Sequence, residues 1–331
     1  MKFKLFIGID VSKSTIDVYV RNSGIHSVFP NNYEGFLEMM EWIREKHGGF
    51  QADEMLFVFE HTGLYSYNLA LFLEQEGCPF SMVAGLELKR SLGISRGKSD
   101  KSDARAIAEY AFEKKEKLKL HKLPSKTMEQ LKRLLSYRER LVKEKTAYMN
   151  RLQEFEEILP EDELVLLSKS HKEVISCLKE QIETVGNELF ILIKEDGELL
   201  KQYRLINSIK GVGPQTAMLM IVLTNGFTLF ESWRKFASYA GIAPFPNESG
   251  VFKGRTKVSK LANKRIKTLL SLCAATSIQH NPEMKQYYER RLMEGKNEMS
   301  TINIIRNKIL SRIFAVINRE TPYVDIFKFA A

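Results

Sequence analysis

The sequence predicts an α/β N-terminal part followed by an all-α remainder, and three features of the 331-residue chain support that division. Short apolar runs of strand length alternate with amphipathic stretches up to about residue 120. Pro124 marks a boundary, after which apolar residues recur at seven-residue intervals. Beyond residue 203 the pattern changes to short helices separated by turns. We therefore expect three domains, at residues 1–120, 125–200 and 203–331.

The N-terminal part contains alternating strand and helix signals. The expected strands are Leu5–Ile9, Thr15–Val20, His26–Phe29, Met55–Phe59 and Phe80–Ala84. The expected helices are Tyr33–Lys46, Tyr65–Glu76, Leu86–Leu92 and Asp100–Lys117. The order βββ-α-β-α-β-α is that of an RNase H-like domain. Its first three strands form a meander, and helical crossovers add the remaining strands in parallel.

The middle of the chain predicts two long helices. In the first, two seven-residue series are separated by charged residues: Met128, Leu135, Val142, Met149, and Leu134, Leu141, Tyr148, Phe155. Pro160 ends this helix, and a second continues through Val174, Leu178, Ile182, Val185, Leu189 and Leu192. The two helices can pack as an antiparallel coiled-coil hairpin or make contacts between chains. A plain spacer explains the pattern as well as a dimerisation device does.

The C-terminal part is predicted to be helical. Residues 208–217 resemble the turn of a helix-hairpin-helix motif, and a Gly/Lys-rich loop is expected over residues 245–258. The expected helices are Ala217–Leu223, Trp233–Tyr239, Leu261–Gln279, 283–294 and 299–318.

Composition narrows the class of protein. A hydrophobic content of 44% supports packed cores, and a net charge of +9 favours a polyanionic partner, although an ordinary basic protein explains that charge about equally well. Cys78, Cys177 and Cys273 contain no CxxC pair, so neither a zinc site nor a disulfide framework is expected. The sequence shows no signal peptide and no apolar run of membrane-spanning length. We therefore expect a cytoplasmic protein with no membrane partner.

Four carboxylates occupy positions suited to a metal-dependent nuclease. Asp10 and Glu60 end apolar runs, and Asp100 and Asp103 begin a helical stretch. In an RNase H-like topology these positions converge, and oxygen-only sites suit Mg²⁺, of which two ions could activate a nucleophile and stabilise the leaving oxygen. The plainer interpretation is that each acid is a solvated loop or helix-start residue. Asp17 is a further candidate, but it lies on the second strand with no acid expected to converge with it, so it is interpreted as structural or surface.

A second candidate site lies in the C-terminal part. Around Gly211 and Gly213 the backbone can turn tightly, and the N–H groups of the following helix can hold a phosphate. Ser249 alone predicts a turn, but a run of cations follows it, and a serine needs activation to attack phosphorus. The expected nucleic-acid contacts are Lys98, Lys210, Gly211, Gly213, Lys253, Arg255, Lys257, Lys260, Lys264 and Arg265.

Together these motifs resemble the insertion-sequence transposases with an Asp-Glu-Asp-Asp catalytic domain, the "IS one-ten" group. The N-terminal motifs that look like those of the family are Gly8-Ile9-Asp10-Val11-Ser12-Lys13, Glu60-His61-Thr62-Gly63-Leu64-Tyr65 and Lys98-Ser99-Asp100-Lys101-Ser102-Asp103-Ala104. The C-terminal ones are Ile209-Lys210-Gly211-Val212-Gly213-Pro214 and Tyr239-Ala240-Gly241-Ile242-Ala243-Pro244, with Ser249 at the family's nucleophilic serine. Their shared order and spacing cover nearly the whole chain.

The resemblance implies a RuvC-like catalytic domain, a coiled-coil middle and a C-terminal transposase domain. It implies that Asp10, Glu60, Asp100 and Asp103 bind Mg²⁺, and that Ser249 attacks DNA to form a covalent phosphoserine. The serine of one protomer would meet the acids of another, in dimers that assemble into tetramers. A structured bridge RNA would pair with both donor and target DNA.

Three hypotheses follow from the sequence. The leading one is an RNA-guided, Mg²⁺-dependent recombinase of an insertion sequence. The alternative is a Holliday-junction-type endonuclease that uses water as nucleophile, with Ser249 structural. The third is a nucleic-acid-binding protein without catalytic activity, against which the intact set of four acids counts.

Overall fold

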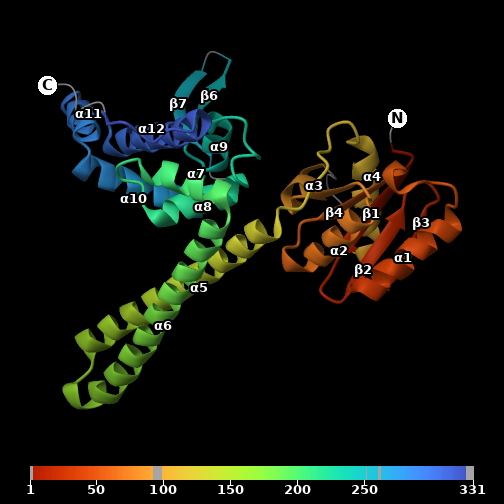
Figure 1. Ribbon diagram of the computed structural model, residues 1–331, viewed down its shortest axis with the longest axis horizontal. Coiled ribbons are helices and arrows are strands. Elements are labelled where there is room, and N and C mark those ends of the chain that lie inside the picture. The colour runs from red at the N-terminus through yellow and green to blue at the C-terminus, as the bar shows by residue number, and fades with distance from the viewer. Residues whose placement is uncertain (1–2, 92–98, 251, 260–261, 326–331) are drawn as a thin grey trace. The chain divides into compact units, whose positions relative to one another are not determined.

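The computed structural model describes residues 3–91, 99–250, 252–259 and 262–325 (Figure 1). It separates into two compact units, Met1–Leu123 and Pro124–Ala331, and each has hydrophobic cores of its own. Among the described residues, no helix combines the length and the apolar character needed to cross a membrane.

The first unit is built on a five-stranded sheet with the order β3-β2-β1-β4-β5. β1, β2 and β3 form an antiparallel meander, and β4 and β5 are added in parallel. This mixed α/β arrangement was predicted, and its order fits an RNase H-like domain. The strands are β1 (Leu5–Val11), β2 (Thr15–Val20), β3 (Ile25–Pro30), β4 (Met55–Glu60) and β5 (Phe80–Val83). The helices are α1 (Tyr33–Lys46), α2 (Leu64–Gln75), α3 (Gly85–Ser91), α4 (Asp100–Glu113) and the short 3₁₀ helix η1 (Ala52–Glu54).

Helices cover both faces of this sheet. Successive side chains of a strand point to opposite faces, and the central strands β1 and β4 are apolar on both. The core under α1 and α2 contains Ile7, Phe36 and Leu69, and the core under α3 and α4 contains Phe6 and Ile107. The two faces therefore differ in their helices, and the candidate acids can be assigned to one face by their position in the alternation.

One glycine sets how closely α4 approaches the sheet. A Cβ atom on Gly8 would lie 2.3 Å from the carbonyl oxygen of Ala104 and 2.3 Å from the backbone nitrogen of Ala108. Both alanines are fully buried. The backbone of α4 therefore lies directly on β1, a separation that a residue with a side chain cannot allow.

Two polar contacts hold α4 in this position. The Nε atom of Arg21 lies 2.8 Å from Oε2 of Glu109, and its guanidinium stacks over the ring of Phe112 at 3.6 Å. The hydroxyl of Tyr110 donates to Oε1 of Glu87 at 2.7 Å, which joins α4 to α3. The helix is thus fixed both to the meander and to its neighbouring helix.

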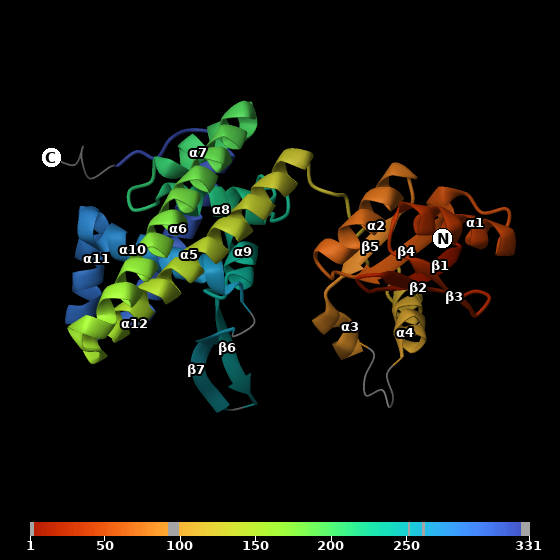
Figure 2. The same ribbon diagram turned by 90° about the horizontal axis from the view of Figure 1, so that it is seen from below.

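The second unit begins with two long helices, α5 (Lys126–Ile158) and α6 (Glu161–Glu195), that lie side by side (Figures 1 and 2). They are antiparallel, since Lys172 lies 3.7 Å from Glu156 near the connection while Arg138 lies beside Gly186 at the other end. Of the two packings that the sequence allowed, these helices form the antiparallel hairpin within one chain. Pro160 stands at the N-cap of α6, where its missing N–H is harmless.

The base of this hairpin shares a core with the C-terminal helices. Leu131 and Leu189 belong to the same buried cluster as Ile266 and Ile309. The remaining helices are α7 (Gly197–Asn207), α8 (Pro214–Thr224), α9 (Trp233–Tyr239), α10 (Lys264–His280), α11 (Pro282–Met293) and α12 (Glu298–Arg319). This shared core joins the hairpin to the C-terminal helices within one compact unit. The division into domains at residues 125–200 and 203–331 therefore stays a prediction.

The expected loop over residues 245–258 is wrong. This segment forms an antiparallel β-hairpin of β6 (Pro244–Ser249) and β7 (Phe252–Val258), which projects from the helices of its unit (Figure 2). All six residues of β6 are exposed, so no buried face imposes the alternation of apolar and polar residues by which a strand is recognised.

The close approach at Gly8 yields a direct test. We expect Gly8→Ala to destabilise the first unit by about 3 kcal/mol, because the new methyl group overpacks backbone atoms that cannot move independently. Thermal and urea unfolding of the purified chain would measure the change. Gly48→Ala is the matched control, since a Cβ atom at that position would have its nearest neighbour 3.4 Å away. Equal stability of the two variants would contradict the close-packing argument.

Candidate active site and nucleic-acid contacts

Asp10 and Glu60 lie at the ends of adjacent parallel strands. β1 and β4 are paired with Ile9 opposite Phe59, so the next residue of each strand is a carboxylate. Both acids are half-buried. By the alternation along each strand, Asp10 shares the face of Gly8 and Glu60 that of Val58, which is the face covered by α3 and α4.

Asp100 and Asp103 lie in the first turn of α4. Ser99 caps the helix by accepting from the backbone nitrogen of Ser102 at 3.2 Å, and Ser102 Oγ accepts from the backbone nitrogen of Ser99 at 3.1 Å. Acids in a first turn are favoured by the helix dipole. The packing of Ala104 on Gly8 brings this turn to the end of β1, where Asp10 lies.

The electrostatic environment of Asp10 reflects this convergence. Burial is the largest cause that raises the pKa of Asp10, to about 6, and the negative charges of Asp103, Asp100, Asp17 and Glu60 contribute in that order. All three other predicted acids therefore act on Asp10 at electrostatic range. Like charges gathered in a half-buried place repel one another unless a cation or a proton neutralises them.

The fifth acid, Asp17, was not recognised as part of this group. It pairs across the sheet with Asp10, is only 8% exposed, and lies 2.8 Å from Nε2 of His26. The expectation that Asp17 has no partner among the acids does not hold, because it lies opposite Asp10, whereas its contact with His26 fits the structural interpretation. The available signal was an aspartate inside an alternating strand, where that residue type is disfavoured.

The carboxylate of Glu60 occupies space left by a glycine. A Cβ atom on Gly85 would lie 2.1 Å from Oε1 of Glu60. Gly85 begins α3, and Glu60 pairs with Val83 at the end of β5. The absent side chain thus determines where the carboxylate points. His61, the next residue, accepts a hydrogen bond on Nδ1 from the backbone nitrogen of Gly63 at 3.3 Å, in keeping with a structural role.

The four acids fit a divalent cation by their chemistry. Their ligand atoms are oxygens, which Mg²⁺ prefers, and burial together with the charges of the neighbouring acids raises the pKa of Asp10. Among the residues that the structure describes, no three acidic, histidine or cysteine side chains are close enough to chelate one ion.

Ser249 lies in the second unit, at the end of β6. It pairs with Phe252 across the hairpin, is exposed, and precedes Gly250, whose φ is +59°. A left-handed residue at that place closes the hairpin and suits glycine. The backbone therefore presents Ser249 beside the turn of a projecting hairpin, where a large ligand can reach it.

The predicted nucleic-acid contacts differ in their surroundings. Lys98 and Lys260 lie outside the described residues, and of Lys253 and Arg255 only the backbone, on β7, is described. Lys257 and Lys264 are exposed. Lys210 lies 2.6 Å from Asp325, and its neighbour Gly211, with a φ of +89°, packs against Ser277, while Gly213 caps α8.

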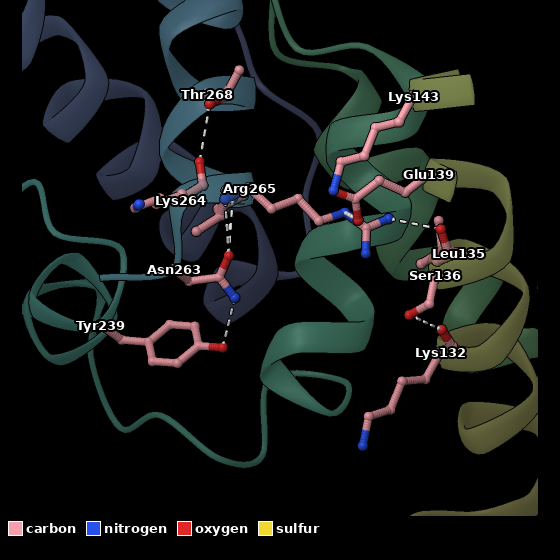
Figure 3. A network of polar contacts seen from close by, with 11 residues as sticks. Lys132, Leu135, Ser136, Glu139, Lys143, Tyr239, Asn263, Lys264, Arg265 and Thr268 are labelled. Atoms are coloured by element: carbon pink, nitrogen blue, oxygen red, sulfur yellow. Dashed lines mark hydrogen bonds and ion pairs between the residues drawn. The ribbon is translucent and has the colours of Figure 1, made fainter. Parts of the chain in front are cut away.

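Arg265 stabilises the second unit from within. Its Nε lies 3.1 Å from Oε2 of Glu139, and its NH2 group donates to the carbonyl oxygen of Leu135 at 3.0 Å (Figure 3). Asn263 caps α10 beside it and donates to the hydroxyl of Tyr239 at 2.9 Å. This network joins α10 to α5, so the guanidinium of Arg265 already has partners.

Known proteins resemble the chain along most of its length. A family model described as "Transposase", for DEDD transposases of the IS110 type, matches residues 7–158, and a model described as "Transposase IS116/IS110/IS902 family" matches residues 203–289. The pilin gene-inverting protein of Moraxella lacunata is 28% identical over 332 residues, which span 97% of this chain and 98% of the relative. The transposase for insertion sequence element IS1111A of Coxiella burnetii is 27% identical over 75% of this chain and 73% of its own.

The raised pKa of Asp10 predicts a dependence of stability on pH. Its folded pKa of about 6 exceeds the ordinary value of 3.8, so the stability it contributes is complete below the lower value and is lost as pH rises through the higher one. We expect Asp10→Asn to raise the free energy of unfolding above pH 6 by roughly 1 kcal/mol after allowance for solvent screening. Urea denaturation in chelator at several pH values would measure it. A variant less stable than wild type at high pH would disprove the repulsion.

The position of Glu60 against Gly85 predicts a defect in metal binding with little loss of stability. In Gly85→Ala the new methyl group displaces a flexible carboxylate rather than backbone, so the free energy of unfolding should change by less than about 1 kcal/mol. Affinity for Mg²⁺ or Mn²⁺, measured by titration calorimetry, should fall. Gly48→Ala again serves as control. Unchanged metal affinity in Gly85→Ala would show that the position of Glu60 is unimportant for the ion.

Proposed function

Because the chain belongs to the IS110 family of insertion-sequence transposases, we propose that it cuts and rejoins DNA by metal-assisted attack of a serine. The family makes it a DNA transposase. The metal ligands, the nucleophile and the guide below are our proposals for how it acts.

The observation that carries the proposal is the set of acids around Asp10. Four carboxylates from two strands and one helix act together on a half-buried side chain at one end of a sheet. A purely structural cluster of this kind destabilises the fold and serves no packing purpose. A site for divalent cations explains the cluster, and DNA phosphates are substrates on which such sites act.

We assign Asp10, Glu60, Asp100 and Asp103 as the residues that hold Mg²⁺. Bound there, the ions would neutralise phosphate charge and stabilise the leaving oxygen. The chain itself supplies orientation: Gly85 leaves room for the carboxylate of Glu60, and the cap at Ser99 fixes the turn that carries the two aspartates. Asp17, whose Oδ1 lies 2.8 Å from Nε2 of His26, pairs with Asp10 across the sheet and places a fifth carboxyl group beside the four.

We assign Ser249 as the nucleophile. Its Oγ would form a bond to a DNA phosphorus as the bond from that phosphorus to a strand oxygen breaks, the serine proton passing to solvent and the departing oxygen gaining one. The resulting phosphoserine conserves the energy of the broken bond, so a second DNA hydroxyl can later displace the serine. The exposed position beside the hairpin turn and the basic residues of β7 support this assignment.

Rejoining favours this mechanism over simple hydrolysis. One relative is named for inverting a pilin gene. Inversion of a segment requires that every broken strand be joined again. A covalent serine linkage conserves the energy of the broken phosphodiester bond for that step. Hydrolysis by water releases that energy, so the strand could not be rejoined without another source. The endonuclease that uses water therefore remains as the alternative outcome of the experiment below.

We further propose a nucleic-acid surface and an RNA guide. Lys257 and Lys264, which are exposed, and the basic strand β7 are suited to phosphates, as is the turn between α7 and α8. The family resemblance supports guidance by a structured bridge RNA that pairs with donor and target DNA, and dimers that assemble into tetramers. Loss of recombination after treatment of the copurified complex with ribonuclease would support the guide.

The nucleophile assignment has a direct test. We expect Ser249→Ala to abolish both recombination and the protein–DNA adduct while DNA binding survives, because only the attacking oxygen is removed. Copurified protein and RNA, incubated with labelled donor and target duplexes and Mg²⁺, would be resolved on a denaturing gel with peptide mapping of any adduct. Ser170→Ala, a change at an exposed serine of α6, is the control. Cleavage by Ser249→Ala at the wild-type rate would establish water as the nucleophile.

A further inference from the structure

A basic cavity lies beside the edge strand of the first unit. It has a volume of about 870 Å³ and is bounded by β5, α3, the end of α4 and the segment that follows α4. Four cationic side chains line it, Arg90, Lys114, Lys117 and Lys119. None of these residues was expected to contact nucleic acid, and the chemistry proposed above does not use them.

The charge of this cavity is not neutralised from within. In the part of the chain that the structure describes, none of the four cations forms an ion pair, in contrast to Arg21 and Lys4 of the same unit. The acid among the lining residues is Glu87, and its carboxylate accepts from the hydroxyl of Tyr110 at 2.7 Å. An excess of positive charge therefore faces the cavity and is available to an anionic ligand.

Hydrogen bonds hold the wall of the cavity against β5. Ser81 Oγ donates to the carbonyl oxygen of Lys119 at 3.0 Å, and the backbone nitrogen of His121 donates to the carbonyl oxygen of Phe80 at 2.9 Å. The backbone nitrogen of Met82 donates to Nδ1 of His121 at 3.1 Å. Burial lowers the pKa of His121, which favours the neutral ring that accepts this hydrogen bond. These hydrogen bonds hold the segment that follows α4 along β5, so this wall of the cavity has a defined position.

The cavity lies on the same face of the sheet as the acids. Val83, which lines it, packs with Val58 and Leu88 under α3 and α4. Val83 also pairs with Glu60, and α3 begins at Gly85, against which the Glu60 carboxylate lies. The cavity therefore adjoins the Glu60 end of the acidic cluster on one face of the sheet.

We propose that this cavity binds the sugar-phosphate backbone of the DNA strand on which the acidic cluster acts. Cations from α3 and from the segment that follows α4, with apolar Leu86 and Leu118 among them, match the repeated phosphates and flat bases of a strand better than one compact anion. The cavity anchors the strand on the Glu60 side of the cluster. This inference rests on the proposed DNA substrate, and it adds a binding site in the first unit to those proposed in the second.

Removal of cavity charge should weaken DNA binding. In the full-length chain, Lys114→Ala combined with Lys117→Ala should reduce the slope of log affinity against log salt by about 2, because each lysine that is removed leaves one phosphate without its cation. Fluorescence anisotropy with a labelled DNA duplex of arbitrary sequence and its separated strand would measure it. Lys46→Ala combined with Lys89→Ala is the control, since it removes equal charge from exposed lysines outside the lining.

A second variant should change affinity in the opposite direction. Glu87→Gln keeps an oxygen that accepts from Tyr110 but removes the negative charge, so DNA should bind roughly threefold more tightly, with a steeper dependence on salt. A gain of affinity cannot arise from misfolding. Wild-type affinity in both the lysine pair and Glu87→Gln would overturn the inference.

The outcomes separate this inference from the proposed function. If wild type binds and recombines DNA and the lysine pair behaves like its control, the cavity proposal fails and the function stands. If the lysine pair loses affinity for an RNA duplex but not for DNA, the DNA assignment is wrong. If wild type forms no DNA complex at any salt concentration with its copurified RNA present, the proposed function fails with it.

Discussion

The acidic cluster depends on one interaction, the approach of α4 to the backbone of β1 at Gly8. Because this glycine has no Cβ, Ala104 lies on the strand itself, and the first turn of α4 reaches the strand end. Parallel pairing of β1 with β4 then adds Glu60. Carboxylates separated by about ninety residues in the chain thereby act on Asp10 together. A larger residue at position 8 would move the helix and disperse them.

The carboxylates around Asp10 destabilise the fold by repulsion, and the same carboxylates are the ones proposed to bind cations. Burial and four neighbouring acids raise the pKa of Asp10, so the ionised form of this side chain is unfavourable in the folded chain. Two local features reduce the repulsion between the carboxylates. His26 contacts Asp17, and the missing side chain of Gly85 leaves room for the carboxylate of Glu60. On the same face, the basic cavity provides the opposite charge. A negative centre with a positive flank can bind a polyanion while still gathering cations at the point of reaction.

In the second unit, cations of similar sequence context have different roles. Arg265 holds α10 to α5 through Glu139, and Lys210 pairs with Asp325, whereas Lys257 and Lys264 are exposed. A basic run in the sequence is suited to phosphates, but an arginine whose guanidinium already has partners within the chain stabilises the fold. Composition therefore favours a polyanionic partner but does not indicate which side chains would bind it.

The sequence by itself determined the elements whose signals are local. Periodic apolar residues predicted the five strands and the long helices, and acids at the ends of apolar runs singled out Asp10 and Glu60 as candidates. Only the tertiary structure decided what depends on distant partners. It covered β2 on both faces, which buries Asp17 opposite Asp10, and it paired the exposed segment 245–258 as a hairpin without a buried face. It also assembled the cavity from segments that carry no common motif, because side-chain neighbours across a sheet are set by packing rather than by spacing along the chain.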